Sequence, residues 1–459
     1  MTRILITDAT SYLNSYIVLY SLEMGLEVRL AVSRERNEAW LTQIENIYSV
    51  YSTTPDIYEV DLEDLGQVFR AVQGCDAIIH SLVQDQTTEI DNPSKLTKKS
   101  LNEALNLMKA AKRKQIRRIV FSGSATNVYA GKKGNQFDDD HWGDIENMES
   151  LQRARLYVEK TVWYQNNQWD EEKRLDLTVL NLGELFGPSI GLRPEHPSNR
   201  LVSRLLLGKI NQVLKFNIPT IDVRDAALVH LKVLDNKETF NKRINTLEGV
   251  HWVKDIAGVL NDEFEQIGYQ VSESEIGKFP VTLLRLLDRR YKRKLDRYGK
   301  AIRISNERLK EVFKFKFRPL DETIIEMGYD LFEKGIDGGR SDNRSGGDFY
   351  DSRRNMSNVH SEWSFFRGFS LDFWSDLIGI DSILVFDFFA IFFSFCEFFD
   401  FLTNFLELAP PEINDASKSR MQSLKPPGRE SVGSGVESIP NQIEFEKSID
   451  LQEETNTGK

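Results

Sequence analysis

The sequence predicts an α/β protein built on a doubly wound parallel sheet. Short apolar runs alternate with amphipathic helical stretches from the N-terminus to about residue 335. Continuous apolar runs of this length are typical of strands that are buried on both faces. Strands separated by single helices pair in parallel, and their helices cover both faces of the sheet. Such a sheet binds ligands beyond the carboxyl ends of its strands.

The first β-α-β unit is the clearest of these observations. Ile4 to Ile6 form a short apolar strand, and Thr7 to Asn14 form a polar turn. Tyr16 to Met24 repeats its apolar residues at helical spacing, and Gly25 ends that helix. Val28 to Val32 is the second strand. The spacing fits a parallel crossover.

The same alternation continues along the chain. Strand ends or strands are expected at Tyr58–Leu62, Ala77–His80, Arg118–Ser122 and Leu177–Leu180, with helices up to Val72 and over Leu101–Ala111 and Leu151–Asn166.

Composition limits the class of partner. The net charge of -11 argues against nucleic acid. The two cysteines, Cys75 and Cys396, provide neither a disulfide framework nor the spacing of a metal site. A strand begins within a few residues of the N-terminus, without an apolar leader, so we expect a reducing, cytoplasmic location.

The C-terminal part has a different composition. Residues 336–362 are rich in Gly, Ser, Asp and Arg and are expected to form a linker; residues 409–459 are polar and expected to be disordered. Residues 363–408 are rich in phenylalanine, but Asp381 and Asp387 make a membrane-spanning helix costly. Such a spanning helix, attachment to a membrane surface or a partner protein, and no folded role at all are equally open for this segment.

Several stretches carry a family resemblance. In order they are ILIT-DATSYLN, EVDL, AIIHSLV, RRIVFSGSATNVY, EKTVW, LNLGELFGP and IDVRDAALVHL. Over residues 1–335 the chain resembles the extended short-chain dehydrogenase/reductases (the NAD-dependent epimerase/dehydratase superfamily), and within them the dihydroflavonol reductase and cinnamoyl-CoA reductase-like branch. The resemblance implies a Rossmann domain with a smaller C-terminal substrate portion. It also implies NAD or NADP as cofactor, a small carbonyl or alcohol substrate, and a homodimer as one possible assembly.

The cofactor turn departs from the pattern of that family. The family has T-G-x-x-G-x-x-G, whereas Asp8, Ser11 and Asn14 occupy the three glycine places here. The carboxylate of Asp8 would face an anionic pyrophosphate, although aspartate tolerates left-handed backbone. The turn is therefore either a weakened nucleotide site or a structural turn that holds no dinucleotide. The resemblance assigns to this site Thr7, Asp8, Ser11, Tyr12 and Leu13.

Other segments match further parts of a cofactor site. Arg34, next to Ser33, would favour NADP slightly over NAD, unless that loop is only a solvated charged surface. His80 is more typical of a buried histidine at a strand end than of a ligand. The remaining matches are Asp61 and Leu62 for the adenine, His80 and Ser81 for the nicotinamide ribose, and Asn181 for the cleft.

The catalytic residues of the family are only partly present. Ser124 matches the serine that positions the carbonyl. When the following helix is aligned on Glu159 and Trp163, Leu151 takes the tyrosine place and Arg155 the lysine place. Leucine cannot transfer a proton, whereas Arg155 could still hold ribose hydroxyls.

A shifted pair offers another possibility. Tyr157 and Lys160 are three residues apart, so they share a face of the helix, but they lie further along it than the usual pair. They would be catalytic only after a change of register. Otherwise Tyr157 packs and Lys160 is solvated.

Two classes of function follow. The first is an NAD(P)-dependent oxidoreductase acting on a carbonyl or hydroxyl group, with Ser124, Tyr157 and Lys160 as catalytic residues. The second is a pseudoenzyme, a non-catalytic nucleotide-binding sensor or scaffold with the same fold. The charged residues Asp222, Arg224 and Asp225 are expected to form a structural salt-bridge cluster.

Overall fold

The computed structural model describes residues 3–33, 48, 51, 54–82, 93–191, 196–278, 281–282, 295 and 297–335. Arg34 and the three segments 336–362, 363–408 and 409–459 lie outside the described residues. No helix in the described part of the chain is long and apolar enough to cross a membrane.

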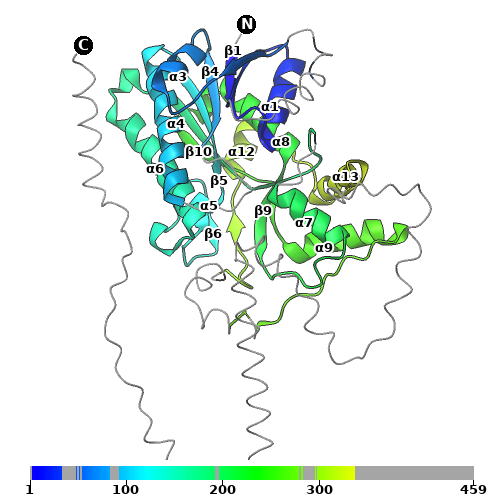
Figure 1. Cartoon of the computed structure of the whole chain (residues 1–459). Coiled ribbons are helices and arrows are strands. Elements are labelled where there is room, and N and C mark those ends of the chain that lie inside the picture. Colours follow the sequence, from blue (N-terminus) through cyan, green and yellow to red (C-terminus); the bar gives the residue numbers. More distant parts are fainter. Residues whose placement is uncertain are drawn as a thin grey trace, which may run out of the picture. The chain divides into compact units, whose positions relative to one another are not determined.

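A seven-stranded sheet in the order β10-β7-β5-β4-β1-β2-β3 forms the centre of the fold (Figure 1). Every neighbouring pair in it is parallel. The predicted doubly wound parallel sheet is therefore confirmed. The strand order reverses between β1 and β4, where sheets of this kind open a crevice for ligands. The strands are β1 (Arg3–Thr7), β2 (Glu27–Val32), β3 (Asp56–Glu59), β4 (Ala77–Ser81), β5 (Arg118–Ser124), β7 (Asp176–Leu182) and β10 (Lys242–Thr246).

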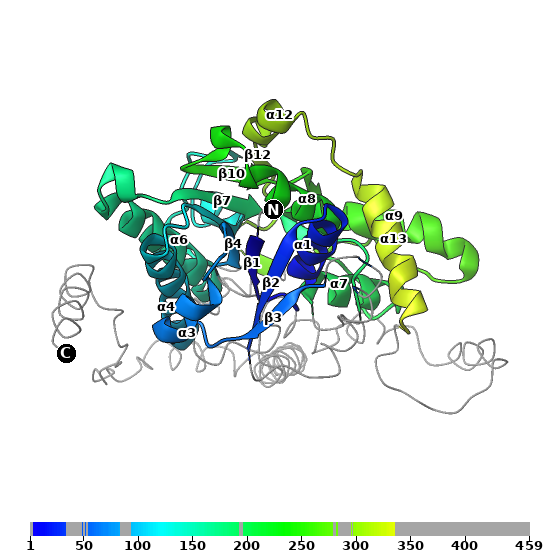
Figure 2. The same cartoon turned by 90° about the horizontal axis from the view of Figure 1, so that it is seen from above.

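Helices cover both faces of this sheet, as Figure 2 shows from above. One face carries α1 (Tyr12–Glu23) and α8 (Val223–Leu234). The other carries α3 (Leu65–Ala71), α4 (Pro93–Arg113) and α6 (Ser150–Gln168). The central strands are consequently buried on both sides, as their continuous apolar runs predicted.

A smaller portion is built from the C-terminal half of residues 1–335; the family resemblance implied such a portion but placed it mainly in the C-terminal third. Its sheet has the order β11-β9-β8. These strands are β8 (Glu184–Phe186), β9 (Asn217–Asp222) and β11 (Gly249–Trp252). The helices beside them are α7 (Pro197–Leu206), α9 (Val253–Phe264) and α13 (Leu320–Glu333). The remaining elements are α5 (Thr126–Tyr129), β6 (Gln136–Phe137), β12 (Arg303–Ile304) and α12 (Glu307–Phe313).

The first helix starts earlier than the sequence predicted. It begins at Tyr12 rather than near Tyr16, because Ser11 caps it and its side chain accepts from the Asn14 amide at 3.2 Å. The polar turn is therefore short, and the N-terminus of α1 lies close to the end of β1.

The charged cluster after β9 is structural, as expected. Arg224 donates to both carboxylate oxygens of Asp222, with Nε at 2.9 Å and Nη2 at 2.6 Å. The Thr323 hydroxyl from α13 reaches the same carboxylate at 2.9 Å. Asp225 pairs with Arg318. These contacts fasten the C-terminal helix to the larger portion.

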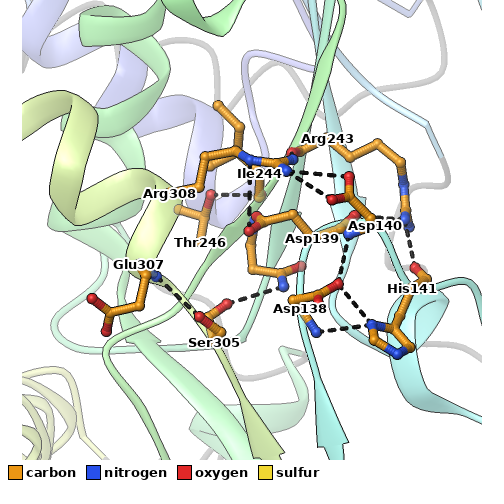
Figure 3. A network of polar contacts seen from close by, with 11 residues as sticks. Asp138, Asp139, Asp140, His141, Arg243, Ile244, Thr246, Ser305, Glu307 and Arg308 are labelled. Carbon is orange, nitrogen blue, oxygen red and sulfur yellow. Dashed lines mark hydrogen bonds and ion pairs between the residues drawn. The ribbon is translucent and has the colours of Figure 1, made fainter.

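A second polar network holds the loop before α6 in place (Figure 3). Arg308 donates to the Arg243 carbonyl at 2.9 Å and pairs with Asp140 at 3.0 Å. Arg243 donates to the Asp139 carbonyl at 2.9 Å, and its guanidinium also pairs with Glu159 at 2.6 Å. The Glu159 side chain is 0% exposed and that of Arg243 is 7% exposed, so this ion pair is fully desolvated. It joins α6 to β10.

Candidate functional site

The turn between β1 and α1 keeps a glycine-like backbone without glycine. Asp8 has φ +48°, the left-handed conformation that a glycine would adopt most easily. Asn14 is completely buried, and its Nδ2 donates to the Thr7 carbonyl at 2.8 Å and to the Asp8 carbonyl at 3.3 Å. Side-chain hydrogen bonds therefore hold a turn whose geometry glycines would otherwise permit.

The cofactor residues predicted on α1 lie at its first turn. Ser11 is half-buried at the N-cap, while Tyr12 and Leu13 are buried. A helix N-terminus attracts anions through its free amides and its dipole. Asp8 counteracts this attraction, because its carboxylate stands in the same turn.

Glu103 adds a second carboxylate near this turn, which sequence reasoning missed. It lies in α4 and is only 6% exposed. Burial raises the pKa of Glu103 to about 7; Lys99 opposes the shift, and the carboxylates of Glu63, Asp8 and Asp61 add to it. The sequence could have predicted the burial of Glu103, because Glu103 and Leu107 are four residues apart and therefore lie on the same, apolar face of α4.

This raised pKa predicts a pH-dependent stability. The folded protein binds the Glu103 proton more tightly than the unfolded chain, so stability falls as pH rises from about 4.5 to 7. Glu103→Gln is expected to stabilise the protein at pH 8 by roughly 2 kcal/mol and to have little effect at pH 4. Urea unfolding at both pH values measures this difference. Glu238→Gln, an exposed control, should leave the pH dependence unchanged; equal stability of parent and Glu103→Gln at pH 8 would contradict the assignment.

The residues predicted for the adenine, Asp61 and Leu62, and for the 2′-phosphate of NADP, Ser33, are at the surface or just below it. Ser33 and Asp61 are exposed, and Leu62 is buried. The Asp61 carboxylate accepts from the Glu63 amide at 2.9 Å, which orders the loop after β3. Ser81, predicted near the nicotinamide ribose, is half-buried at the end of β4.

His80 is a buried strand-end histidine. It is 0% exposed, and its Nδ1 lies 2.7 Å from the Thr7 hydroxyl. Burial lowers the pKa of His80 to about 3, so the ring is neutral. Its ring joins β4 to Thr7 in β1, as the prediction of a buried strand-end histidine implied, while its assignment to the ribose stays a prediction.

Ser124 stands at the carboxyl end of β5, where the family's carbonyl-positioning serine is expected. Its hydroxyl is half-buried and lies 2.9 Å from the Thr126 hydroxyl. The Thr126 amide also donates to Ser124 Oγ at 3.3 Å. Nearby, Asn181 is completely buried, and Gly123 leaves it room, because a Cβ on Gly123 would lie 2.9 Å from Asn181 Oδ1.

Helix α6 runs without interruption from Ser150 to Gln168. Tyr157 and Lys160 are thus roughly on the opposite side of the helix from Arg155, about 200° and 140° around it. Lys160 is exposed, and its ammonium lies 5.7 Å from the centre of the Trp142 ring. The assignment of Tyr157 and Lys160 as catalytic residues stays a prediction; within the helix they lie on a different side from Arg155.

Three polar side chains that the sequence did not bring together are electrostatically coupled near the cleft. Burial lowers the pKa of Arg155, and the carboxylate of Glu184 in β8 opposes that shift. Burial raises the pKa of Tyr129. The negative charge of Glu184 raises this pKa further, whereas the positive charge of Arg297 lowers it. The negative charge of Glu184 thus acts on Arg155, the residue that the sequence comparison aligned with the family's lysine. The feature of the sequence that could have predicted this coupling is Glu184 itself, an acidic residue within the LNLGELFGP segment that resembles the family's cleft lining.

Together, the parallel sheet with its reversal of strand order, the turn at the start of α1 and Ser124 at the end of β5 define a dinucleotide-binding type of α/β protein, built like the NAD(P)-dependent oxidoreductases. The family model described as "NAD dependent epimerase/dehydratase family" matches residues 4–245, and the chain belongs to this family.

Similar proteins are reductases. Cinnamoyl-CoA reductase 2 of Medicago truncatula is 26% identical over 257 residues, which are 54% of this chain and 72% of the relative. Dihydroflavonol 4-reductase of Arabidopsis thaliana is 30% identical over 194 residues, 40% of this chain and 50% of that protein. The resemblance noted in the sequence is confirmed.

Solved structures show the same fold. Vestitone reductase from alfalfa (Medicago sativa) has a TM-score of 0.57 at 19% identity, covering 73% of this chain and 100% of that chain. Yeast methylglyoxal/isovaleraldehyde reductase, solved with NADPH, has a TM-score of 0.57 at 17% identity and covers 73% of this chain and 100% of that one.

Proposed function

We propose that this chain is a nucleotide-binding member of its family that senses NADP(H) or NAD(H) and does not catalyse hydride transfer. The observation that carries the proposal is the uninterrupted helix α6, with Leu151 at the place of the family's proton-donating tyrosine. Leucine has no proton to give, and Arg155 replaces the lysine that would lower the pKa of a tyrosine there.

The turn at the start of α1 supports nucleotide binding. Its backbone keeps the left-handed conformation at Asp8, and Asn14 hydrogen-bonds the carbonyls on either side of the turn. The amides of the first turn of α1 are thereby held as an anion site. The carboxylate of Asp8 makes binding weak. NADP is slightly preferred because Arg34 follows Ser33, and a relative of the same fold was solved with NADPH.

Titration with NADPH and NADP⁺, followed by fluorescence, tests binding. Asp8→Asn is expected to tighten NADPH binding by about tenfold, because it removes a negative charge facing the pyrophosphate and keeps tolerance of positive φ. Asp8→Gly should behave alike. If glycine tightens binding and asparagine does not, backbone freedom rather than charge is responsible. Absence of binding by all three proteins would favour a scaffold instead.

A second candidate function is reduction of a small carbonyl compound to an alcohol, or the reverse, with NAD(P)(H). The position of Ser124 favours it, because the hydroxyl stands at the end of β5 ready to orient a carbonyl. Its test is turnover of NADPH with a panel of aldehydes and ketones. Loss of turnover in Tyr157→Phe, with folding intact, would support Tyr157 and Lys160 as catalytic residues.

A further inference from the structure

A short segment after β8 is held from two sides by hydrogen bonds. It comprises Gly187, Pro188 and Ser189, in the family's cleft-lining stretch. Gly187 has φ +115°, and a Cβ there would meet the Asp222 carboxylate at 3.3 Å, so only glycine fits without strain. The path of the backbone at this point is therefore narrowly defined.

From one side, two tyrosines of α1 donate to carbonyls of the segment. The Tyr12 hydroxyl donates to the Gly187 carbonyl, and the Tyr16 hydroxyl donates to the Pro188 carbonyl at 3.0 Å. The rings are 4% and 8% exposed. Burial raises the pKa of both tyrosines, so both remain protonated donors at any physiological pH.

From the other side, α13 and the residue after it hold the same segment. The Ser189 amide donates to the Asp330 carboxylate at 3.0 Å, and the Gly187 amide points to the Met327 sulfur at 3.4 Å. The Lys334 ammonium donates to the Ser189 carbonyl and to Asp330. The segment thus connects the helix of the nucleotide turn with the C-terminal helix.

We propose that Tyr12 and Tyr16 are positioning residues that couple the nucleotide turn to the C-terminal portion through Gly187–Ser189. Tyr12 is the first residue of α1, directly after the N-cap, so a phosphate bound at that turn contacts the helix that carries both hydroxyls. A ligand at the start of α1 thereby stabilises the segment Gly187–Ser189, and the segment in turn stabilises α13. This coupling rests on the proposed nucleotide binding. The hydrogen bonds from Tyr12 and Tyr16 that hold the segment do not depend on it.

The test is hydrogen exchange of the full chain, followed in peptides covering residues 187–191 and 320–333. Without ligand, Tyr12→Phe/Tyr16→Phe is expected to speed exchange in both peptides about tenfold, because two buried hydroxyl bonds are lost. Exchange in residues 118–124 should not change, which separates a local effect from global destabilisation.

Tyr20→Phe is the matched control. Tyr20 lies one turn further along the same face of α1, its ring 5.9 Å from that of Tyr16, and it packs half-buried against the same core. It makes no hydrogen bond to the segment among the described contacts, so its replacement should leave both peptides unchanged. Exchange in the double variant equal to that of the parent, or an equal effect of Tyr20→Phe, overturns the proposal.

Added NADPH tests the coupling. In the parent, it is expected to slow exchange of residues 320–333, and in the double variant this protection should be lost. Protection of α13 to the same extent in the double variant overturns the role of the hydroxyls. If NADPH binds the parent in the fluorescence titration but leaves exchange of residues 320–333 unchanged, the coupling fails and the proposed nucleotide binding stands. If the titration shows no binding, the proposed nucleotide binding fails as well. In both cases the ligand-free comparison decides whether the two hydroxyl bonds hold the segment.

Discussion

Replacing Leu151 with tyrosine and Arg155 with lysine is expected to create NADPH-dependent turnover of aldehydes, at least about 100-fold above the parent protein. The exchange restores a proton donor and the cation that lowers its pKa, on a helix that begins at Ser150. Leu151 and Arg155 are both half-buried, so neither replacement is made in the fully buried core. The loss of NADPH absorbance with a panel of aldehydes measures the effect.

Ser124 provides the control for this gain of activity. Ser124→Ala in the double variant should return turnover to the level of the parent, because the carbonyl loses its positioning hydroxyl. Leu151→Tyr alone should give a smaller rate, since arginine would still stand where the family has lysine. A double variant that binds NADPH and remains inactive would show that restoring this pair is not sufficient for turnover.

Removing the charge of Glu159 should destabilise the protein by about 3–5 kcal/mol. The carboxylate lies 2.6 Å from the Arg243 guanidinium, and both side chains are buried. It also accepts from Asn127 Nδ2 at 2.6 Å. Glu159→Gln would therefore leave a buried cation without its counter-charge. The midpoint of urea unfolding measures the loss.

An exposed ion pair gives the matched comparison for Glu159. Asp170 and Lys173 lie 2.6 Å apart, with side chains 74% and 62% exposed. Asp170→Asn makes the same chemical change, yet we expect no measurable loss of stability, because the pair is solvated. If Glu159→Gln were as stable as Asp170→Asn, Arg243 would have to be compensated by the Asp139 and His141 carbonyls and the Trp142 ring alone.

Local pattern was enough to predict the larger portion of the fold. A strand such as Ile4–Ile6, which is buried on both faces, must be apolar throughout. In a helix such as α4 that covers the sheet, apolar residues must recur with the helical period, so that they share one face. Both constraints are visible in a single sequence. Ser124 was predictable for the same reason, because its place follows from the end of β5. The start of α1 was misplaced because a serine cap was read as part of a turn.

The candidate site depended on contacts that no local pattern contains. Tyr157 and Lys160 share a face of the helix, but which face meets the cleft is decided by packing of Glu159 against Arg243, which is distant in the sequence. The role of His80 followed from its pairing with Thr7 across two strands. Glu103, Glu184 and Tyr129 acquired their importance only through burial and through neighbouring charges.

For this protein, then, the order of residues alone determined a parallel sheet wrapped by helices, together with the loss of the family's glycines and tyrosine. The tertiary structure decided which groups surround these places. The Asn14 side chain hydrogen-bonds the turn that glycines would form, the charge of Glu184 acts on Arg155, and the hydroxyls of Tyr12 and Tyr16 donate to the segment after β8. The physical reason is that strand and helix periodicity act over a few residues, whereas charge, burial and hydrogen bonding depend on which distant groups meet.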